Sequence, residues 1–296
     1  MKKATIIIIN YNDKLRVKRA IDSALNQTWQ NTEVIMVDDG SDMETRKIYE
    51  DYTFFEGNER FTLIQLERDD TQARTPSRAR NRGFEIARGD YVCFLDSDNY
   101  FDSTFLEEML KPGKDIAFCN WEILGLQQYQ VKIHEVWNLE NPVLQNYLQF
   151  THLDHQCIIV KRDLLTKLNP NGLPYDERLP RSQDCDLLVG LMLLTNEWEL
   201  VPKNLFFFEK HEEDQMKQIA SIHGKTLWSL KRGINIQWLS GIIGANPTLM
   251  LSFYQAMKDF STSKEWKTAY DESEFKLYYN EFLGKLKGER TEVING

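Results

Sequence analysis

Short apolar runs alternate with polar turns and amphipathic segments through the first half of the chain. The first run, Thr5 to Ile9, is apolar at nearly every position, which is typical of a strand buried on both faces of a mostly parallel sheet. A polar turn follows, and apolar residues from Val17 to Leu25 then recur at helical spacing. The same alternation predicts further strands at Glu33 to Val37, Phe61 to Leu66 and Tyr91 to Leu95, with helices at 44–52 and from Thr75-Pro76 onward.

Strands that alternate with helices predict an α/β fold with an open, mostly parallel sheet flanked by helices. In such a sheet, ligands bind at the carboxyl ends of the strands. The pattern becomes less regular after the turn at Lys111 to Lys114, and beyond about residue 222 it is helical and rich in aromatic residues. We therefore expect a main domain at 1–221, with halves at 1–111 and 112–221, and a helical C-terminal region at 222–296.

The composition of the chain excludes several classes of protein. It has 296 residues, of which 42% are apolar, as expected of a globular protein. A net charge of −9 and a pI near 5.2 argue against nucleic-acid binding. The four cysteines contain no C-x-x-C pair that would indicate a zinc site. The apolar stretch after Met1-Lys2-Lys3 is too short for an export signal, so we expect a cytoplasmic protein without a membrane span.

Two acidic clusters follow predicted strands. Asp38 and Asp39 come after the second strand, and Asp96 and Asp98 come after the fourth. Two carboxylates spaced in this way suit a Mg²⁺ or Mn²⁺ ion that also contacts diphosphate oxygens. Four carboxylates gathered at one sheet edge would repel one another without a cation. The alternative is that these residues only form turns or cap helices.

Several motifs, taken together, resemble the family 2 glycosyltransferases of the GT-A fold across roughly residues 4 to 215. These motifs occur in the order of the family, and they are Ile6-Ile7-Ile8-Ile9-Asn10-Tyr11-Asn12, Ser23-Ala24-Leu25-Asn26-Gln27-Thr28, Val37-Asp38-Asp39-Gly40-Ser41, Ala79-Arg80-Asn81-Arg82-Gly83, and Gly89-Asp90-Tyr91-Val92-Cys93-Phe94-Leu95-Asp96-Ser97-Asp98. One departure is Ile9-Asn10, where the family often has Pro-Thr; it affects the expected shape of that loop and not the strand.

The resemblance implies a nucleotide-sugar donor site that also holds a divalent metal ion. It places Tyr11 and Asn12 in the nucleotide pocket and Asp39 near the base or ribose. It places Arg80 or Asn81 close to the donor, where Asp96 is also expected. It makes Asp98 the metal ligand and UDP the expected nucleotide, with Mn²⁺ or Mg²⁺ as the cation.

Two further residues are assigned roles from the resemblance. An inverting transfer needs a base for the acceptor hydroxyl, and Gln183-Asp184 matches the family motif that supplies it, so Asp184 is the candidate base. Asp186 is an alternative, although both residues also suit the first turn of a helix. His211 follows the apolar run Leu205 to Phe208, where related enzymes often carry a histidine that contacts the metal or diphosphate. A purely structural histidine is the other interpretation of His211.

The predicted function is metal-dependent transfer of a sugar from a nucleotide-diphosphate donor to a saccharide, glycolipid or glycoprotein acceptor, for cell-surface polysaccharide or glycoconjugate synthesis. A nucleotidyltransferase is disfavoured because Asn10 to Asp13 is not a glycine-rich phosphate loop. The other alternative is a non-catalytic nucleotide-sugar-binding subunit or scaffold. The C-terminal helices could form a homo-oligomer or contact the inner face of a membrane.

Overall fold

The computed structural model describes residues 2–53, 59–67, 76–124, 127–129, 153–179, 183–195 and 197–209. All of them belong to one compact unit, Met1–Tyr254. The strands are β1 (Ala4–Asn10), β2 (Thr32–Asp38), β3 (Phe61–Gln65), β4 (Tyr91–Asp96), β5 (Tyr100–Phe101), β6 (Ile116–Ile123), β7 (Gln127–Tyr129), β8 (Ile158–Lys161) and β9 (Trp198–Phe208). The helices are α1 (Val17–Leu25), α2 (Met43–Thr53), α3 (Pro76–Ile86), α4 (Phe105–Leu110), η1 (His155–Cys157), α7 (Arg162–Leu165) and α8 (Gln183–Leu194).

A mixed sheet of nine strands forms the centre of the described part of the chain. Its strand order is β3-β2-β1-β4-β8-β6-β9-β5, and β7 pairs with β6. The neighbours from β3 to β4 are parallel, as the sequence predicts. Beyond β4 the sheet is mixed, because β8 is antiparallel to both β4 and β6. The predicted α/β fold is confirmed, and the parallel arrangement is concentrated in the first half.

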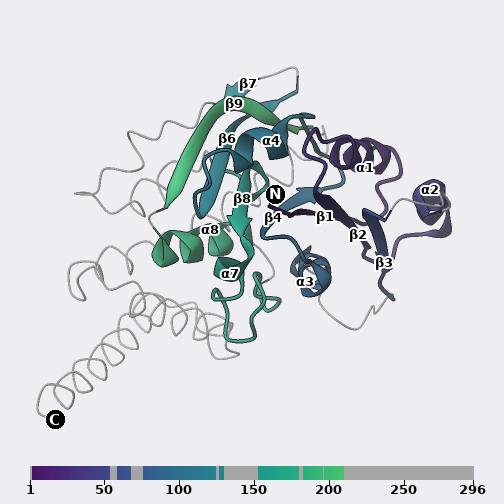
Figure 1. Cartoon of the computed structure of the whole chain (residues 1–296). Helices are drawn as coiled ribbons and strands as arrows, with labels where there is room; N and C mark the ends of the chain where they lie inside the picture. Colours follow the sequence, from purple (N-terminus) through teal and green to yellow (C-terminus); the bar gives the residue numbers. More distant parts are fainter. Residues whose placement is uncertain are drawn as a thin grey trace, which may run out of the picture. The chain divides into compact units, whose positions relative to one another are not determined.

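The apolar run of β1 lies at the centre of the parallel half. Ile6, Ile7 and Ile8 are fully buried because β2 and β4 flank them in the sheet and helices cover both faces. Figure 1 shows α1 and α3 on opposite sides of β1 and β2. Gly83 of α3 packs so closely on the sheet that a Cβ there would lie 2.5 Å from Cγ2 of Ile7. The glycine of the Arg80 to Gly83 motif therefore allows the helix to approach the sheet.

The register of the parallel strands brings their carboxyl ends to one edge. Asn10 at the end of β1 is paired with Asp38 at the end of β2. On the other side of β1, Ile9 is paired with Asp96 at the end of β4. The two acidic clusters that are 58 residues apart in sequence, at Asp38 and Asp96, therefore flank the same strand.

The predicted elements within the described residues agree with the structure to within a few residues. The core segments expected around residues 158–160, 187–194 and 205–208 are β8, part of α8 and the end of β9. The predicted helical region 222–296 lies outside the described residues, so the predicted domain division stays a prediction. Across the described part of the chain, no helix combines the length and apolar character required to cross a bilayer.

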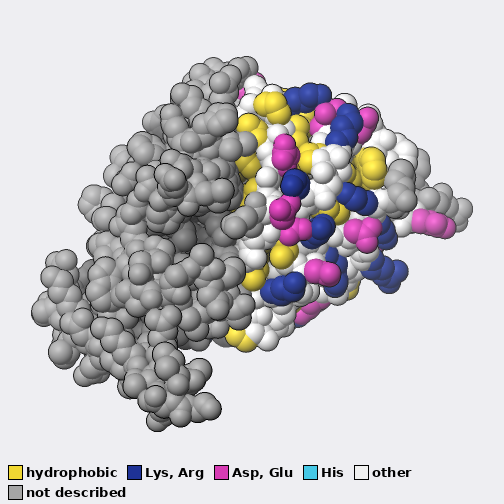
Figure 2. Space-filling view, turned by 60° about the vertical axis from the view of Figure 1, so that its left-hand side comes forward, with side chains coloured by type: hydrophobic (Ala, Val, Ile, Leu, Met, Phe, Trp, Pro, Cys, Tyr) yellow, Lys and Arg dark blue, Asp and Glu magenta, His cyan; other side chains and the backbone are white. Residues whose placement is uncertain are grey.

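Charged side chains of both signs are mixed on the face drawn in Figure 2. Lysine and arginine side chains lie beside aspartate and glutamate side chains over its described residues. Ion pairs between surface side chains of opposite charge occur among the described residues, including Lys14 with Glu44 and Arg82 with Glu85. On this face, the described residues therefore form no extended field of one sign.

Candidate active site

A cleft of about 430 Å³ opens at the carboxyl ends of β1, β2 and β4. Its position is the one at which open α/β sheets bind ligands. The walls combine carboxylates, two guanidinium groups and an aromatic ring. The residues that line it are Ile9, Asn10, Tyr11, Asp13, Arg16, Asp39, Pro76, Ala79, Arg80, Asp96, Ser97 and Asp98.

Asp96 is held in place by hydrogen bonds to both of its carboxylate oxygens. Nη2 of Arg80 donates to Oδ1 at 2.6 Å, and Nε2 of Gln156 donates to Oδ2 at 3.2 Å. Oε1 of Gln156 also accepts from the backbone N–H of Asp96 at 2.8 Å and from the side chain of Asn99 at 3.1 Å. Gln156 is only 2% exposed, so these bonds are made away from water. Asp96 is therefore an oriented anion that is neutralised by Arg80.

Asp98 differs from Asp96 because one of its oxygens is left without a hydrogen bond. Oδ1 of Asp98 is buried, and no donor within the described residues reaches it. Burial raises the pKa of Asp98 to about 7; the negative charges of Asp96 and Asp13 add to this effect, while Arg16 opposes it. A buried carboxylate with an unsatisfied oxygen is a group that a cation would stabilise.

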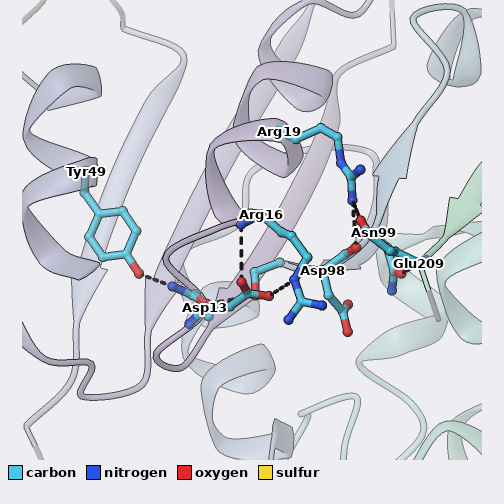
Figure 3. Close-up of polar contacts among 9 residues, drawn as sticks. Asp13, Arg16, Arg19, Tyr49, Asp98, Asn99 and Glu209 are labelled. Atoms are coloured by element: carbon cyan, nitrogen blue, oxygen red, sulfur yellow. Dashed lines mark hydrogen bonds and ion pairs between the residues drawn. The ribbon is translucent and has the colours of Figure 1, made fainter. Parts of the chain in front are cut away.

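The loop after β1 supplies a second charged pair beside Asp98 (Figure 3). Nε of Arg16 donates to Oδ2 of Asp13 at 2.6 Å, and the backbone N–H of Arg16 donates to Oδ1 of the same residue at 3.2 Å. On the other side, Nη2 of Arg19 donates to the carbonyl oxygen of Asp98 at 3.1 Å and also pairs with Glu209. The backbone of Asp98 is therefore fixed by a residue of α1.

The two residues of the first acidic cluster have different environments. Asp39 lines the cleft, as predicted. Asp38 is fully buried, and it accepts hydrogen bonds from Nε of Arg46 and from the hydroxyl of Tyr49, both at 3.1 Å. The expectation that all four clustered carboxylates meet in one site is therefore wrong for Asp38, because its charge is used to join β2 to α2. Asp13 takes the fourth place in the cleft.

The other predicted donor-site residues also divide into two groups. Tyr11 is 46% exposed and lines the cleft. Asn12 has a positive φ of 54°, and its Oδ1 accepts from the backbone N–H of Asp42 at 2.8 Å, which ties the loops after β1 and β2 together. Asn81 is fully buried, and its side chain bonds both backbone atoms of Tyr175, donating to the carbonyl and accepting from the N–H. The structure thus engages Asn12 and Asn81 in holding loops.

The candidate base, Asp184, lies in the first turn of α8, and its negative charge acts on Arg80 of the cleft. Burial lowers the pKa of Arg80, but the negative charges of Asp96 and Asp184 raise it, and the net direction is upward. Burial also raises the pKa of Tyr175 well above its ordinary value, with Asp184 contributing in the same direction. The guanidinium of Arg80 lies 5.2 Å from the ring centroid of Tyr175. The carboxylate of Asp184 therefore interacts electrostatically with Arg80, which lines the cleft, and with Tyr175.

Four residues near this group, Asp154, His155, Gln156 and Tyr175, have no role in the sequence prediction. Tyr175 and His155 are nearly fully buried and pack edge to face, with ring centroids 6.1 Å apart. Among the described residues, neither ring nitrogen of His155 has a hydrogen-bond partner, although Nδ1 lies 3.4 Å from a carboxylate oxygen of Asp154. Burial raises the pKa of Asp154, and His155 opposes this effect. The adjacent polar residues Asp154, His155 and Gln156 were a signal in the sequence that could have marked this segment.

The part of the chain that the structure describes contains no group of three His, Cys, Asp or Glu side chains arranged to hold a metal ion. His211, the second predicted ligand, lies outside the described residues. Asp98 nevertheless fits a hard cation, because it offers a buried carboxylate oxygen to which no described residue donates a hydrogen bond. A divalent ion that keeps several waters and phosphate oxygens needs only one or two carboxylates from the protein.

Comparison with known proteins agrees with the class of site that the cleft defines. The model of the glycosyl transferase family 2 matches residues 5–167, which is more than half of the chain. The chain therefore belongs to glycosyl transferase family 2, and the predicted resemblance and the prediction of a transferase enzyme are confirmed.

Individual relatives support the same family and fold. The poly(ribitol-phosphate) beta-N-acetylglucosaminyltransferase TarP of Staphylococcus aureus is 35% identical over 119 residues, which cover 39% of this chain and 34% of TarP. The chain thus spans about a third of the length of curated relatives such as TarP. The crystal structure of residues 1–349 of S. aureus TarS with UDP-GlcNAc superposes with a TM-score of 0.56 at 22% identity and covers 71% of this chain and 59% of TarS.

A more distant structural neighbour is the mannosyltransferase PcManGT of Pyrobaculum calidifontis in complex with GDP-Man and Mn²⁺. It has a TM-score of 0.50 at 15% identity and covers 90% of this chain and 82% of its own. Both structural likenesses concern the fold.

Proposed function

We propose that this protein transfers a sugar from a nucleoside-diphosphate donor, with UDP as the nucleotide, to a hydroxyl of a saccharide-type acceptor, and that it requires Mn²⁺ or Mg²⁺. The observation that carries the proposal is the cleft, in which Asp39, Asp96 and Asp98 converge at the carboxyl ends of three parallel strands. The TarS complexes with UDP and UDP-GlcNAc support the choice of UDP-GlcNAc as the first donor to test.

Each side chain of the cleft has a distinct part in this proposal. Tyr11 offers an exposed ring for stacking on the base, and Asp39 offers a carboxylate for the base or ribose. Asp98, with His211 as the second ligand, would hold the divalent ion. When bound, that ion neutralises charge on the departing diphosphate. Arg80 keeps Asp96 oriented, so that Asp96 faces the donor as a fixed anion.

The transfer itself is proposed as a single inverting displacement. Asp184 accepts the proton of the acceptor hydroxyl while the hydroxyl oxygen forms a bond to the anomeric carbon. The bond between that carbon and the diphosphate oxygen breaks, and the nucleoside diphosphate leaves with the electron pair. No covalent intermediate with the enzyme is needed. The negative charges of Asp96 and Asp184 both act on Arg80, which supports a place for Asp184 near the cleft.

The test of the base compares Asp184→Asn with Asp186→Asn in the full chain. Asp184→Asn should reduce transfer by at least about 100-fold, because general base catalysis contributes roughly 10²–10⁴-fold. It should leave the thermal stabilisation by UDP and Mn²⁺ almost unchanged, because the proposal assigns Asp184 to the acceptor and not to the donor. Asp186→Asn is the matched control, since Asp186 is 4% exposed and lies in the same turn of α8. An active Asp184→Asn enzyme would remove Asp184 from this role.

A donor assay separates the enzyme from the alternative of a non-catalytic nucleotide-sugar-binding subunit. The full chain is incubated with UDP-GlcNAc and Mn²⁺, and release of UDP is followed with and without saccharide acceptors. Binding of the donor without any hydrolysis or transfer would favour the non-catalytic subunit. A cytoplasmic location, a role in cell-surface polysaccharide or glycoconjugate synthesis, a position at the inner face of the membrane and a homo-oligomer through residues 222–296 are further proposals.

A further inference from the structure

The guanidinium of Arg16 lies on the wall of the cleft beside Asp98 (Figure 3). Arg16 is the residue that precedes α1, and it donates two hydrogen bonds to the carboxylate of Asp13, one from its side chain and one from its backbone. Its Nε donates to Oδ2 at 2.6 Å, and its backbone N–H donates to Oδ1 at 3.2 Å. One carboxylate therefore fixes both the start of the helix and the direction of the side chain.

The charge of Arg16 acts directly on Asp98. Both residues line the cleft, and Figure 3 shows the side chain of Arg16 beside that of Asp98. Arg16 therefore lies close to the carboxylate that the proposed function assigns to the metal. A diphosphate bound to an ion at Asp98 would arrive next to this guanidinium.

The two arginines of the cleft have different surroundings. Each pairs with a carboxylate at 2.6 Å, Arg80 with Asp96 and Arg16 with Asp13, but the side chain of Arg80 is only 6% exposed. The side chain of Arg16 is 25% exposed, and it borders the open volume of the cleft. Because a planar guanidinium binds phosphate oxygens through charge-assisted hydrogen bonds, Arg16 is suited to an incoming diphosphate.

We propose that Arg16 is a donor-binding residue that contacts the diphosphate of the nucleotide, and that Asp13 is a positioning residue that holds Arg16 for this contact. This inference rests on the proposed function, since it concerns the same donor. The sequence offered no sign of it, because Arg16 is one of many charged residues in the polar turn and helix that follow the first strand.

A different role for Arg16 makes opposite predictions. If Arg16 only offsets the charges of Asp13 and Asp98, its removal leaves the cleft more negative. Binding of Mn²⁺ alone would then become stronger, and the affinity for UDP in saturating Mn²⁺ would not fall. If Arg16 contacts the diphosphate, the affinity for UDP falls, while the affinity for uridine, which has no phosphate, is retained.

The experiment measures binding of UDP and of uridine to the full chain in Mn²⁺, for the wild type, Arg16→Gln, Arg16→Lys and Lys14→Gln. Loss of a charge-assisted hydrogen bond predicts that Arg16→Gln weakens UDP binding by at least about tenfold and changes uridine binding by less than about twofold. Arg16→Lys should fall between the wild type and Arg16→Gln, because it keeps the charge and loses the planar fork. Lys14→Gln removes the same charge from a residue that pairs with Glu44, and should bind UDP as the wild type does.

The outcomes separate the inference from the proposed function. If the wild type binds UDP and Arg16→Gln binds it equally well, the inference is overturned and the proposed function stands. Equal weakening of UDP and uridine binding would also overturn the inference, because it would indicate damage to the loop and not loss of a phosphate contact. If the wild type binds neither UDP nor GDP in Mn²⁺, both the proposed function and the inference fail.

Discussion

Replacement of Asp98 by asparagine should stabilise the ligand-free protein, and it should do so increasingly as the pH rises. The carboxyl of Asp98 has an ordinary pKa of 3.8, and burial is the main cause that raises the pKa to about 7 in the folded protein. Between these two values the folded chain holds a proton that the unfolded chain has released. Stability therefore falls as the pH rises through this window, because the folded state binds more protons.

The size of the effect follows from the difference of about three pH units. One unit corresponds to about 1.4 kcal/mol, so ionised Asp98 lowers the free energy of unfolding by at most about 4 kcal/mol above pH 7. Near pH 5 the same reasoning gives about 2 kcal/mol, and below pH 4 the effect vanishes. Asparagine cannot ionise, so Asp98→Asn should remove this dependence on pH.

The assay is urea unfolding followed by circular dichroism between pH 4 and pH 8, in a chelator and without nucleotide. The measured quantity is the difference in unfolding free energy between Asp98→Asn and the wild type at each pH. Any change in packing shifts all points equally, so the shape of the curve is the test. Asp163→Asn is the control for loss of one charge, because Asp163 is exposed. A difference that stays flat, or that grows as the pH falls, would refute the reasoning.

Two further predictions concern the supports of the site. Gly89→Ala should destabilise the protein by about 3 kcal/mol or more, because the new Cβ would lie 2.6 Å from the backbone nitrogen of Thr5 and 2.7 Å from the carbonyl oxygen of Tyr91, neither of which moves easily; an unchanged midpoint of thermal unfolding would contradict this. Gln156→Glu should reduce sugar transfer by about tenfold or more at pH 8, because a carboxylate then faces Oδ2 of Asp96 in place of a donor. Gln156→Glu should also weaken the thermal stabilisation by UDP at pH 8. This stabilisation should recover as the pH falls and the new carboxyl is protonated, and a weakening that is independent of pH would count against the role of Gln156.

The sequence was most informative where a residue and its immediate neighbours define the local structure. The apolar run of β1 lies between layers of helices and is buried as predicted, apart from the partly exposed Ile9 at its end. Asp39, Asp96 and Asp98 were found because each follows such a strand, and parallel strands bring their carboxyl ends to one edge. The alternation of strands and helices was sufficient to predict the α/β class for the same reason.

The division of labour among similar residues depends on contacts between distant segments. Asp38 and Asp39 are adjacent in sequence, yet Arg46 and Tyr49 of α2 take Asp38 out of the cleft. Gln156 reaches Asp96 across 60 residues, and the polar residues beside it mark the segment without indicating which residue it contacts. Asn81 matches the family motif, but its side chain donates a hydrogen bond to the backbone carbonyl of Tyr175 and holds that loop.

The sequence alone determined the order of the elements, the sheet edge at which the site forms and the family of the protein, because these follow from local hydrophobic patterning and from motifs that are contiguous in the chain. Only the tertiary structure decided which carboxylates are neutralised, which one keeps an unsatisfied oxygen and where the guanidinium of Arg16 lies. The physical reason is that charge and burial at a site are set by whichever groups the folded chain brings within a few ångströms, and sequence separation does not report that distance.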